Sequence, residues 1–196
     1  MTKKIVRPRG RPRKFDVAEA VAAAQDLFHS KDYETVNVSD VTEALGINTP
    51  SFYSAFGSKA GLYNQVIKRY AQHGAIPLEE LLRPDRPVAE CLSAVLEEAA
   101  RRYSENPAGT GCIVLEGSRC SDQEARKLAR AAHAAAAELI RSFIADRHPD
   151  AADTLTEYMS TVMIGLSAQA RAGKGQKALL DTARLASRAF ASALSD

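Results

Sequence analysis

Residues 38–59, VSDVTEALGINTPSFYSAFGSK, carry the clearest structural pattern in the N-terminal part of this 196-residue chain. Apolar residues recur at helical spacing in two short runs, over 38–45 and 49–56. Gly46 can adopt the positive φ that ends a helix, and Asn48 can cap the helix that follows. Two short helices joined by a turn that contains glycine predict a helix-turn-helix, although the pattern alone also fits a plain helical corner.

In a helix-turn-helix the second helix lies in the major groove of DNA, so its outward side chains are the candidates for base contacts. The candidates are small or polar, and with the two capping asparagines they comprise Asn37, Asn48, Thr49, Pro50, Ser51, Tyr53 and Ser54. None of them is Arg or Lys, so the paired hydrogen bonds that those side chains make with guanine are absent. Contact between thymine methyl groups and Thr49 or Pro50 is favoured instead.

A basic arm precedes the first helix. Residues 1–14 hold seven of the 26 Lys and Arg residues and no acid, which leaves 19 bases against 24 acids in the rest of the chain. The run PRGRP at 8–12 matches the AT-hook pattern, because proline keeps the chain extended and Gly10 lets it enter a narrow A·T-rich minor groove. The alternative is a polybasic tail that binds any phosphate. The candidate DNA contacts in the arm are Arg7, Arg9, Gly10, Arg11, Arg13 and Lys14.

The rest of the chain is predicted to be helical, with almost no strand signal. Apolar periodicity, with breaks at Gly, Pro and Asn, predicts nine helices over about 16–31, 38–45, 49–56, 59–73, 88–104, 112–117, 122–147, 150–172 and 176–194. The pattern is interrupted between Gly74 and Pro87, which indicates a domain boundary. We therefore expect an arm over 1–14, a DNA-binding domain over 15–74 and a larger helical domain over 75–196.

The composition argues against several classes of protein. With 45% hydrophobic and 26% charged residues, no apolar run long enough for a membrane span and no secretory signal, a cytoplasmic globular protein is expected. Neither a disulfide framework nor a zinc site fits the spacing of Cys91, Cys112 and Cys120, so no metal and no cofactor are expected. No catalytic constellation is formed by His29, His73, His133 and His148, so the sequence does not predict an enzyme.

Two segments together resemble the TetR family of bacterial transcriptional regulators. INTPSFYSAFGSKAGLY at 47–63 is similar to the recognition-helix signature of that family, carried here by Tyr53, Phe56, Gly57, Lys59, Leu62 and Tyr63. DVAEAVAAAQDLFHSKDYE at 16–34 is similar to its first helix, through Ala24, Leu27, Phe28 and Tyr33. Asp32 stands where Gly is frequent, and Gly61 stands where a better helix former is common, at an expected cost of up to ~1 kcal/mol.

The resemblance implies an all-α protein with an N-terminal three-helix helix-turn-helix domain and a larger C-terminal helical domain. The larger domain would bind a small-molecule effector and form a homodimer through its last two helices. Lys59, at a helix N-terminus, would contact a DNA phosphate. The implied function is sequence-specific regulation of transcription, as a repressor that an effector releases from a palindromic operator with A·T-rich flanks.

The effector pocket is the part of the site that the sequence specifies least. Candidate lining residues are Tyr103, Cys112, His133, Phe143, Tyr158, Met159 and Met163, each of which also fits a plain core position. In GCIVLEGSRC, residues 111–120, Cys112 and Cys120 lie near Glu116 and Arg119. A neighbouring cation would lower a thiol pKa, so sensing of oxidants or electrophiles by these two cysteines is a further hypothesis.

One other DNA-binding function is compatible with the sequence. An architectural protein of the nucleoid type would bind DNA through the arm with little sequence preference. Replacement of Tyr53 would leave the binding of such a protein unchanged, whereas a sequence-specific regulator would lose operator discrimination.

Overall fold

The computed structural model describes residues 16–105 and 110–194, and every regular element in these ranges is helical. The nine expected helices are present as α1 (Val17–Ser30), α2 (Val38–Leu45), α3 (Thr49–Phe56), α4 (Lys59–His73), α6 (Val88–Glu105), α7 (Ile113–Gly117), α8 (Gln123–Ala145), α9 (Ala152–Arg171) and α10 (Gln176–Ala193). Two short elements were not expected, namely α5 (Leu78–Leu81) and the 3-10 turn η1 (Pro149–Ala151). The all-α prediction is confirmed for the described ranges.

Side-chain caps explain why the first four helices begin where the sequence predicts. The Asp16 carboxylate accepts hydrogen bonds from the backbone N–H groups of α1, and Ser58 caps α4 in the same way. At α2, Asn37 and Asp40 exchange side-chain and backbone hydrogen bonds in a capping box. Asn48 accepts a hydrogen bond from the Ser51 N–H at the start of α3. These caps are local, which is why a linear sequence can reveal them.

Gly61 has a steric reason to be glycine in the first turn of α4. A Cβ atom at this position would overlap the backbone carbonyl of Phe56. The close approach of the two chain segments therefore requires a residue without a side chain. The loss of helix propensity that the sequence predicts for Gly61 is therefore the consequence of close packing where α3 meets α4.

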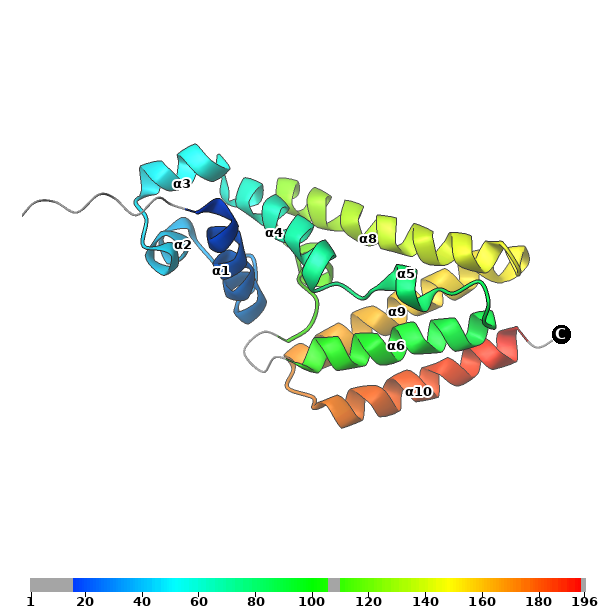
Figure 1. Ribbon diagram of the computed structural model, residues 1–196. Coiled ribbons are helices and arrows are strands. Elements are labelled where there is room, and N and C mark those ends of the chain that lie inside the picture. The colour runs from blue at the N-terminus through cyan, green and yellow to red at the C-terminus, as the bar shows by residue number, and fades with distance from the viewer. Residues whose placement is uncertain (1–15, 106–109, 195–196) are drawn as a thin grey trace, which may run out of the picture.

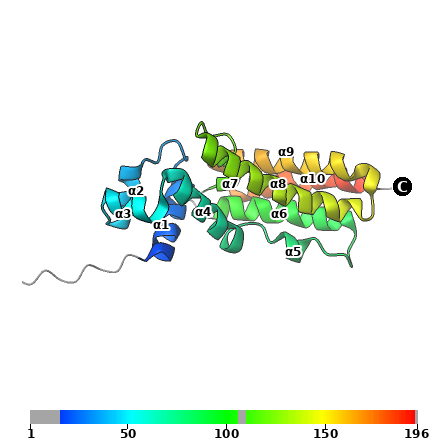
Figure 2. The same cartoon turned by 90° about the horizontal axis from the view of Figure 1, so that it is seen from above.

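The helices form two groups joined by α4. Figures 1 and 2 show α1, α2 and α3 at one end of the molecule, and α6, α8, α9 and α10 running alongside one another at the other. The described C-terminal end lies at the far side from α3 (Figure 1). The core of the smaller group is aromatic: Phe28 stacks on Tyr33 at 5.7 Å, and the edge of Tyr63 meets both rings at 5.2 and 4.9 Å.

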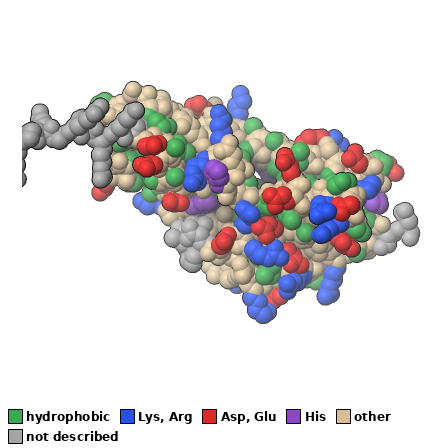
Figure 3. Space-filling model, viewed as in Figure 1, with side chains coloured by type: hydrophobic (Ala, Val, Ile, Leu, Met, Phe, Trp, Pro, Cys, Tyr) green, Lys and Arg blue, Asp and Glu red, His purple; other side chains and the backbone are tan. Residues whose placement is uncertain are grey.

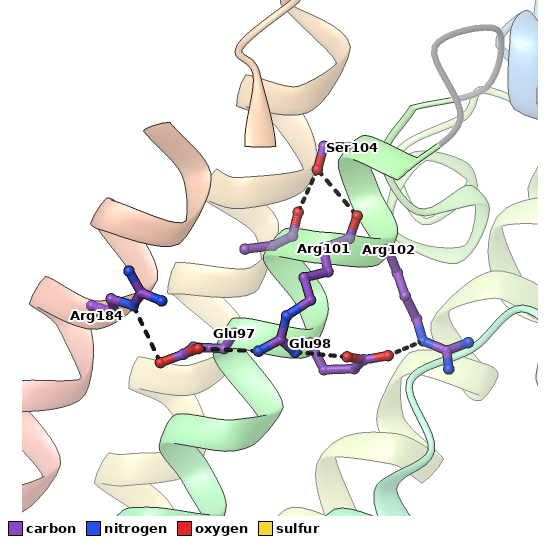
Figure 4. Close-up of polar contacts among 7 residues, drawn as sticks. Glu97, Glu98, Arg101, Arg102, Ser104 and Arg184 are labelled. Atoms are coloured by element: carbon purple, nitrogen blue, oxygen red, sulfur yellow. Dashed lines mark hydrogen bonds and ion pairs between the residues drawn. The ribbon is translucent and has the colours of Figure 1, made fainter. Parts of the chain in front are cut away.

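A series of ion pairs runs along α6, and one of them links α6 to α10 (Figure 4). Arg101 pairs with Glu97 at 3.1 Å and with Glu98 at 2.9 Å, and Glu98 also pairs with Arg102 at 2.6 Å. Arg184 of α10 reaches Glu97 at 3.5 Å. Because these groups are part-exposed, each pair contributes only about 0.3–0.5 kcal/mol. Three of the four pairs lie within α6, and the fourth links α6 to α10.

The distribution of surface charge and the lengths of the helices agree with the charged and hydrophobic content of the sequence. On the face shown in Figure 3, acidic and basic side chains are interspersed over the larger helical group. Among the residues that the structure describes, none of the helices combines the length and the apolar character needed to cross a bilayer.

Candidate nucleic-acid interface

The turn between α2 and α3 has the geometry of a helix-turn-helix. Gly46 ends α2 in the left-handed region with φ of 62°, and its N–H donates to the carbonyl of Glu43 at 3.2 Å. The N–H of Ile47 donates to the carbonyl of Thr42 at 3.1 Å, and only residues 46–48 separate the two helices. Only a residue tolerant of positive φ permits this turn, because a Cβ atom would be strained there.

Helix α3 has one buried face and one outward face. Phe52 is completely buried and Phe56 nearly so, which anchors α3 in the aromatic core. Tyr53 is half exposed, and its ring meets Phe52 edge-on at 5.2 Å, which limits its freedom. The other predicted contact residues that are exposed on this element are Asn48, Thr49, Pro50 and Ser54, while Ser51 is half-buried. A face of this size and polarity suits the floor of a major groove.

The helix-turn-helix segment carries no positive charge of its own. Residues 32–58 contain no Lys, Arg or His, and they contain the four acids Asp32, Glu34, Asp40 and Glu43. The predicted arm contacts Arg7, Arg9, Gly10, Arg11, Arg13 and Lys14 lie outside the described residues. Attraction for a polyanion must therefore come from side chains that flank the helix-turn-helix.

Lys59 holds two carbonyl groups of its own chain. Its ammonium donates to the carbonyl of Tyr33 at 2.9 Å and to that of Val36 at 2.8 Å. The same Nζ lies 4.0 Å from the centroid of the Tyr33 ring, in a cation–π contact. The resemblance implied a phosphate contact for this residue, and the structure adds a structural role that the sequence did not suggest. Asn37 similarly accepts hydrogen bonds from the Asp40 N–H and the Ser39 hydroxyl.

A polar joint connects the turn after α1 with the larger helical group. The Tyr33 hydroxyl donates to the Asp122 carboxylate at 2.8 Å, and the Glu34 carboxylate accepts the N–H of Ser121. Asp32 pairs with Arg171 at 3.2 Å. Sequence reasoning missed this joint, because its partners are about 90 or more residues apart and no local pattern relates them.

A cavity of about 530 Å³ lies beside α4, between α5 and α8. Of the seven predicted pocket residues, Tyr103, Cys112, His133 and Met163 line it. Sequence reasoning missed the α4 residues Ile67 and Tyr70 because their spacing marks only a buried helix face.

The other three predicted pocket residues, Phe143, Tyr158 and Met159, do not line this cavity. The hydroxyl of Tyr158 donates to the carbonyl of Ala186 at 3.1 Å, so this side chain belongs to the contact between α9 and α10. Met159 is completely buried, and the Phe143 ring is covered by the guanidinium of Arg147 at 4.5 Å.

The cysteines lack the environment that a low thiol pKa requires. Burial raises the pKa of the Cys112 thiol, and burial together with the charges of Glu34 and Asp122 raises that of Cys120. The expected cation, Arg119, pairs with Glu116 at 2.9 Å instead. The predicted lowering of these pKa values is therefore wrong. Among the described residues, no cluster of His, Cys, Asp and Glu is arranged to hold a metal ion.

The chain is similar in sequence to known bacterial regulatory proteins that contain a helix-turn-helix. The model of the bacterial regulatory proteins of the tetR family matches residues 20–66. The chain is 50% identical over 196 residues to the HTH-type transcriptional repressor BdcR of Escherichia coli (strain K12), with all of both chains covered. It is 26% identical over 193 residues to the HTH-type transcriptional repressor ComR of the same organism, covering 93% of this chain and 92% of ComR.

A solved structure shows the same fold bound to DNA. A cysteine-substituted form of the TetR family transcriptional regulator CifR, complexed with a 26-base-pair operator, is 30% identical to the chain, with a TM-score of 0.79. The alignment covers 91% of this chain and 99% of CifR.

Proposed function

The chain belongs to the TetR family of bacterial transcriptional regulators, and from that premise we propose that it is a homodimeric repressor that a small molecule releases from its operator. The observation that carries the proposal is the outward face of α3, where Tyr53 is half exposed on a helix anchored by Phe52 and Phe56. The relative of 50% identity bears the name of a transcriptional repressor, and CifR was solved on operator DNA. Its place of action is the cytoplasm, where a bacterial operator lies, and its role is regulation rather than catalysis.

The operator is a pseudo-palindrome that two copies of α3 read in successive major grooves. Contacts from Thr49, Pro50 and Tyr53 supply moderate sequence discrimination, since no Arg or Lys lies on this face. The basic arm adds phosphate attraction and a preference for A·T-rich flanks.

Operator recognition is tested on the DNA that flanks the gene, by footprinting and fluorescence anisotropy. We expect a discrete footprint with two half-sites about one helical turn apart. Replacement Tyr53→Ala should weaken operator binding by about tenfold while affinity for random DNA of equal length and the melting temperature stay unchanged. Uniform protection of the DNA, or operator binding that is indifferent to Tyr53→Ala, would instead indicate an architectural DNA binder.

The dimer is formed by the outward faces of α9 and α10. Leu185 is 65% exposed and Ile164 is 38% exposed, which leaves apolar area on these two helices uncovered in one chain. Small neighbours such as Gly165 and Ala168 allow helices of a second copy to approach closely. Replacement Leu185→Asp should therefore give a monomer in sedimentation and abolish operator binding. The control Leu139→Asp changes a leucine of 52% exposure on α8 and should remain dimeric.

Release by an effector follows from the position of α4. Ile67 and Tyr70 of this helix line the cavity, and its Leu62 and Tyr63 belong to the core under the helix-turn-helix. The Tyr63 hydroxyl also donates to the carbonyl of Ile113 at 2.6 Å, at the first residue of α7. A ligand that displaces α4 thus shifts the pair of recognition helices away from the half-site spacing.

A further inference from the structure

We propose that the cavity beside α4 takes a neutral, mainly apolar molecule with one hydrogen-bond-accepting oxygen, such as a medium-chain ketone or ester, whose oxygen is held by the hydroxyls of Tyr70 and Tyr103. This inference rests on the proposed function and gives the chemical class of the effector.

The walls of the cavity are suited to an apolar body. A volume of about 530 Å³ lies within the range of sites for small molecules. The wall residues that decide this character are Ile67, Ile76, Leu78, Val114, Leu139 and Met163. They come from five elements and the segment before α5, so an aliphatic chain placed between them meets hydrocarbon from several sides.

At the inner end of the cavity, two tyrosine hydroxyls have only a thiol sulfur, a weak acceptor, as hydrogen-bond partner in the described structure. The Tyr70 hydroxyl donates to the Cys112 sulfur at 3.5 Å, and both groups are buried. Tyr103, which is 2% exposed, lies against the same sulfur and lines the same cavity. Because a thiol sulfur accepts hydrogen bonds weakly, a carbonyl oxygen that reached these hydroxyls would be the better acceptor.

A negative charge is disfavoured at this inner end. Burial raises the pKa values of Tyr70, Tyr103 and Cys112, which means that each group resists becoming an anion there. A ligand carboxylate would meet the same desolvation, and none of the lining residues is Lys or Arg. The wall also includes the acids Glu79 and Glu80 of α5, which would repel an approaching anion.

A positive charge is also disfavoured at the inner end. Glu79 and Glu80 are solvent-exposed on α5, whereas Tyr70 and Tyr103 are buried, so solvent screens the two carboxylates from a cation beside the hydroxyls. The guanidinium of Arg102 acts on the Tyr70 hydroxyl and would repel a second cation beside it. His133 is the one basic side chain in the wall and lies on α8. A neutral acceptor is the class that fits both ends of the cavity.

The test uses three probes that share a ten-carbon chain, with the full-length protein on its operator: 2-decanone, decanoate and decyltrimethylammonium. Each is titrated while operator release is followed by fluorescence anisotropy and the melting temperature of the free protein is recorded. We expect 2-decanone to raise the melting temperature and release the operator, at a concentration about tenfold or more below that of either charged probe.

Two variants that each lack one tyrosine hydroxyl then test where the oxygen of 2-decanone binds. Tyr103→Phe and Tyr70→Phe should each weaken the response to 2-decanone by about fivefold, and leave operator affinity without probe unchanged. The matched control Tyr158→Phe removes a hydroxyl that donates to Ala186 outside the cavity, and its response should equal that of the unaltered protein.

Three results would overturn the inference: a charged probe as effective as 2-decanone, an unchanged response in both tyrosine variants, or no response to 2-decanone up to its solubility. Operator binding is also measured without any probe, and that measurement does not depend on which of these three results is obtained. Failure of the ligand class is therefore distinguishable from failure of the regulator function, which would appear as absent operator binding.

Discussion

Lys59 illustrates how one side chain can be assigned from sequence and then acquire a second role in the structure. The family resemblance predicts that its charge, at the N-terminus of α4, contacts a DNA phosphate. Its ammonium is nevertheless engaged by the carbonyls of Tyr33 and Val36, which closes the segment between α1 and α2 against α4. Hydrogen bonds from a charged donor to part-buried acceptors are among the stronger ones in proteins.

Replacement Lys59→Met should therefore destabilise the protein even without DNA, by about 2 kcal/mol of unfolding free energy. Urea unfolding of the DNA-free protein measures this directly. The control Lys68→Met alters an exposed lysine on the same helix and should unfold like the unaltered protein. A residue that only contacts phosphate would give the opposite result, with unchanged unfolding and weaker operator binding.

At the scale of elements, the residues predicted to contact bases and the residues that carry the positive charge lie in different parts of the chain. Helix α3 presents uncharged side chains, and residues 32–58 carry four acids and no base. The arm over 1–14 carries seven bases and no acid. Because counterion release depends on the number of phosphates neutralised, the arm should dominate the salt dependence of binding.

Deletion of residues 1–14 should weaken operator binding and flatten the plot of log affinity against log salt, whereas Tyr53→Ala should leave that slope unchanged. The double replacement of Arg9 and Arg11 by Lys keeps the charge and should keep the slope, but it should lose the preference for A·T-rich flanks. Equal slopes for the deleted and complete chains would show that the arm is not part of the interface.

At the scale of the whole molecule, the hydrogen bond between Tyr33 and Asp122 joins the two helical groups, and we expect it to weaken in acid. Burial opposes ionisation of Asp122, but hydrogen bonds from the Ala125 N–H, the Tyr33 hydroxyl and the Glu124 N–H outweigh it and lower its pKa. A lowered carboxyl pKa contributes stability above the ordinary value, and that contribution is lost as the pH falls through the lowered value.

Replacement Tyr33→Phe should reduce the free energy of unfolding by about 1 kcal/mol near neutral pH and by less in acid, since one bond to the ionised carboxylate is gone. Equilibrium unfolding between about pH 3 and 7 measures the difference, which covers the ordinary range of a carboxyl group. Tyr158→Phe removes a hydroxyl bonded to a carbonyl, so its effect should not vary with pH over that window. A pH-independent loss for Tyr33→Phe would contradict the role given to Asp122.

The helices of the helix-turn-helix region could be predicted from local sequence signals alone. The bounds of α2, α3 and α4 could be predicted to the residue, because caps such as Asn37 and Asn48 and the turn at Gly46 act between residues close in the chain. The four-residue α5 was missed because a single turn next to Pro77 has no periodicity to detect.

Contacts between buried side chains of different helices could not be predicted in this way and are known from the folded chain. The fold brought Tyr70 of α4 to Cys112 and Tyr103, and moved Tyr158 to the contact with α10. Helical spacing tells which face of each helix is buried, but not which other helix covers it. That choice depends on the packing of side chains that are 30 to 90 residues apart, and the cavity and the joint are both made by such contacts.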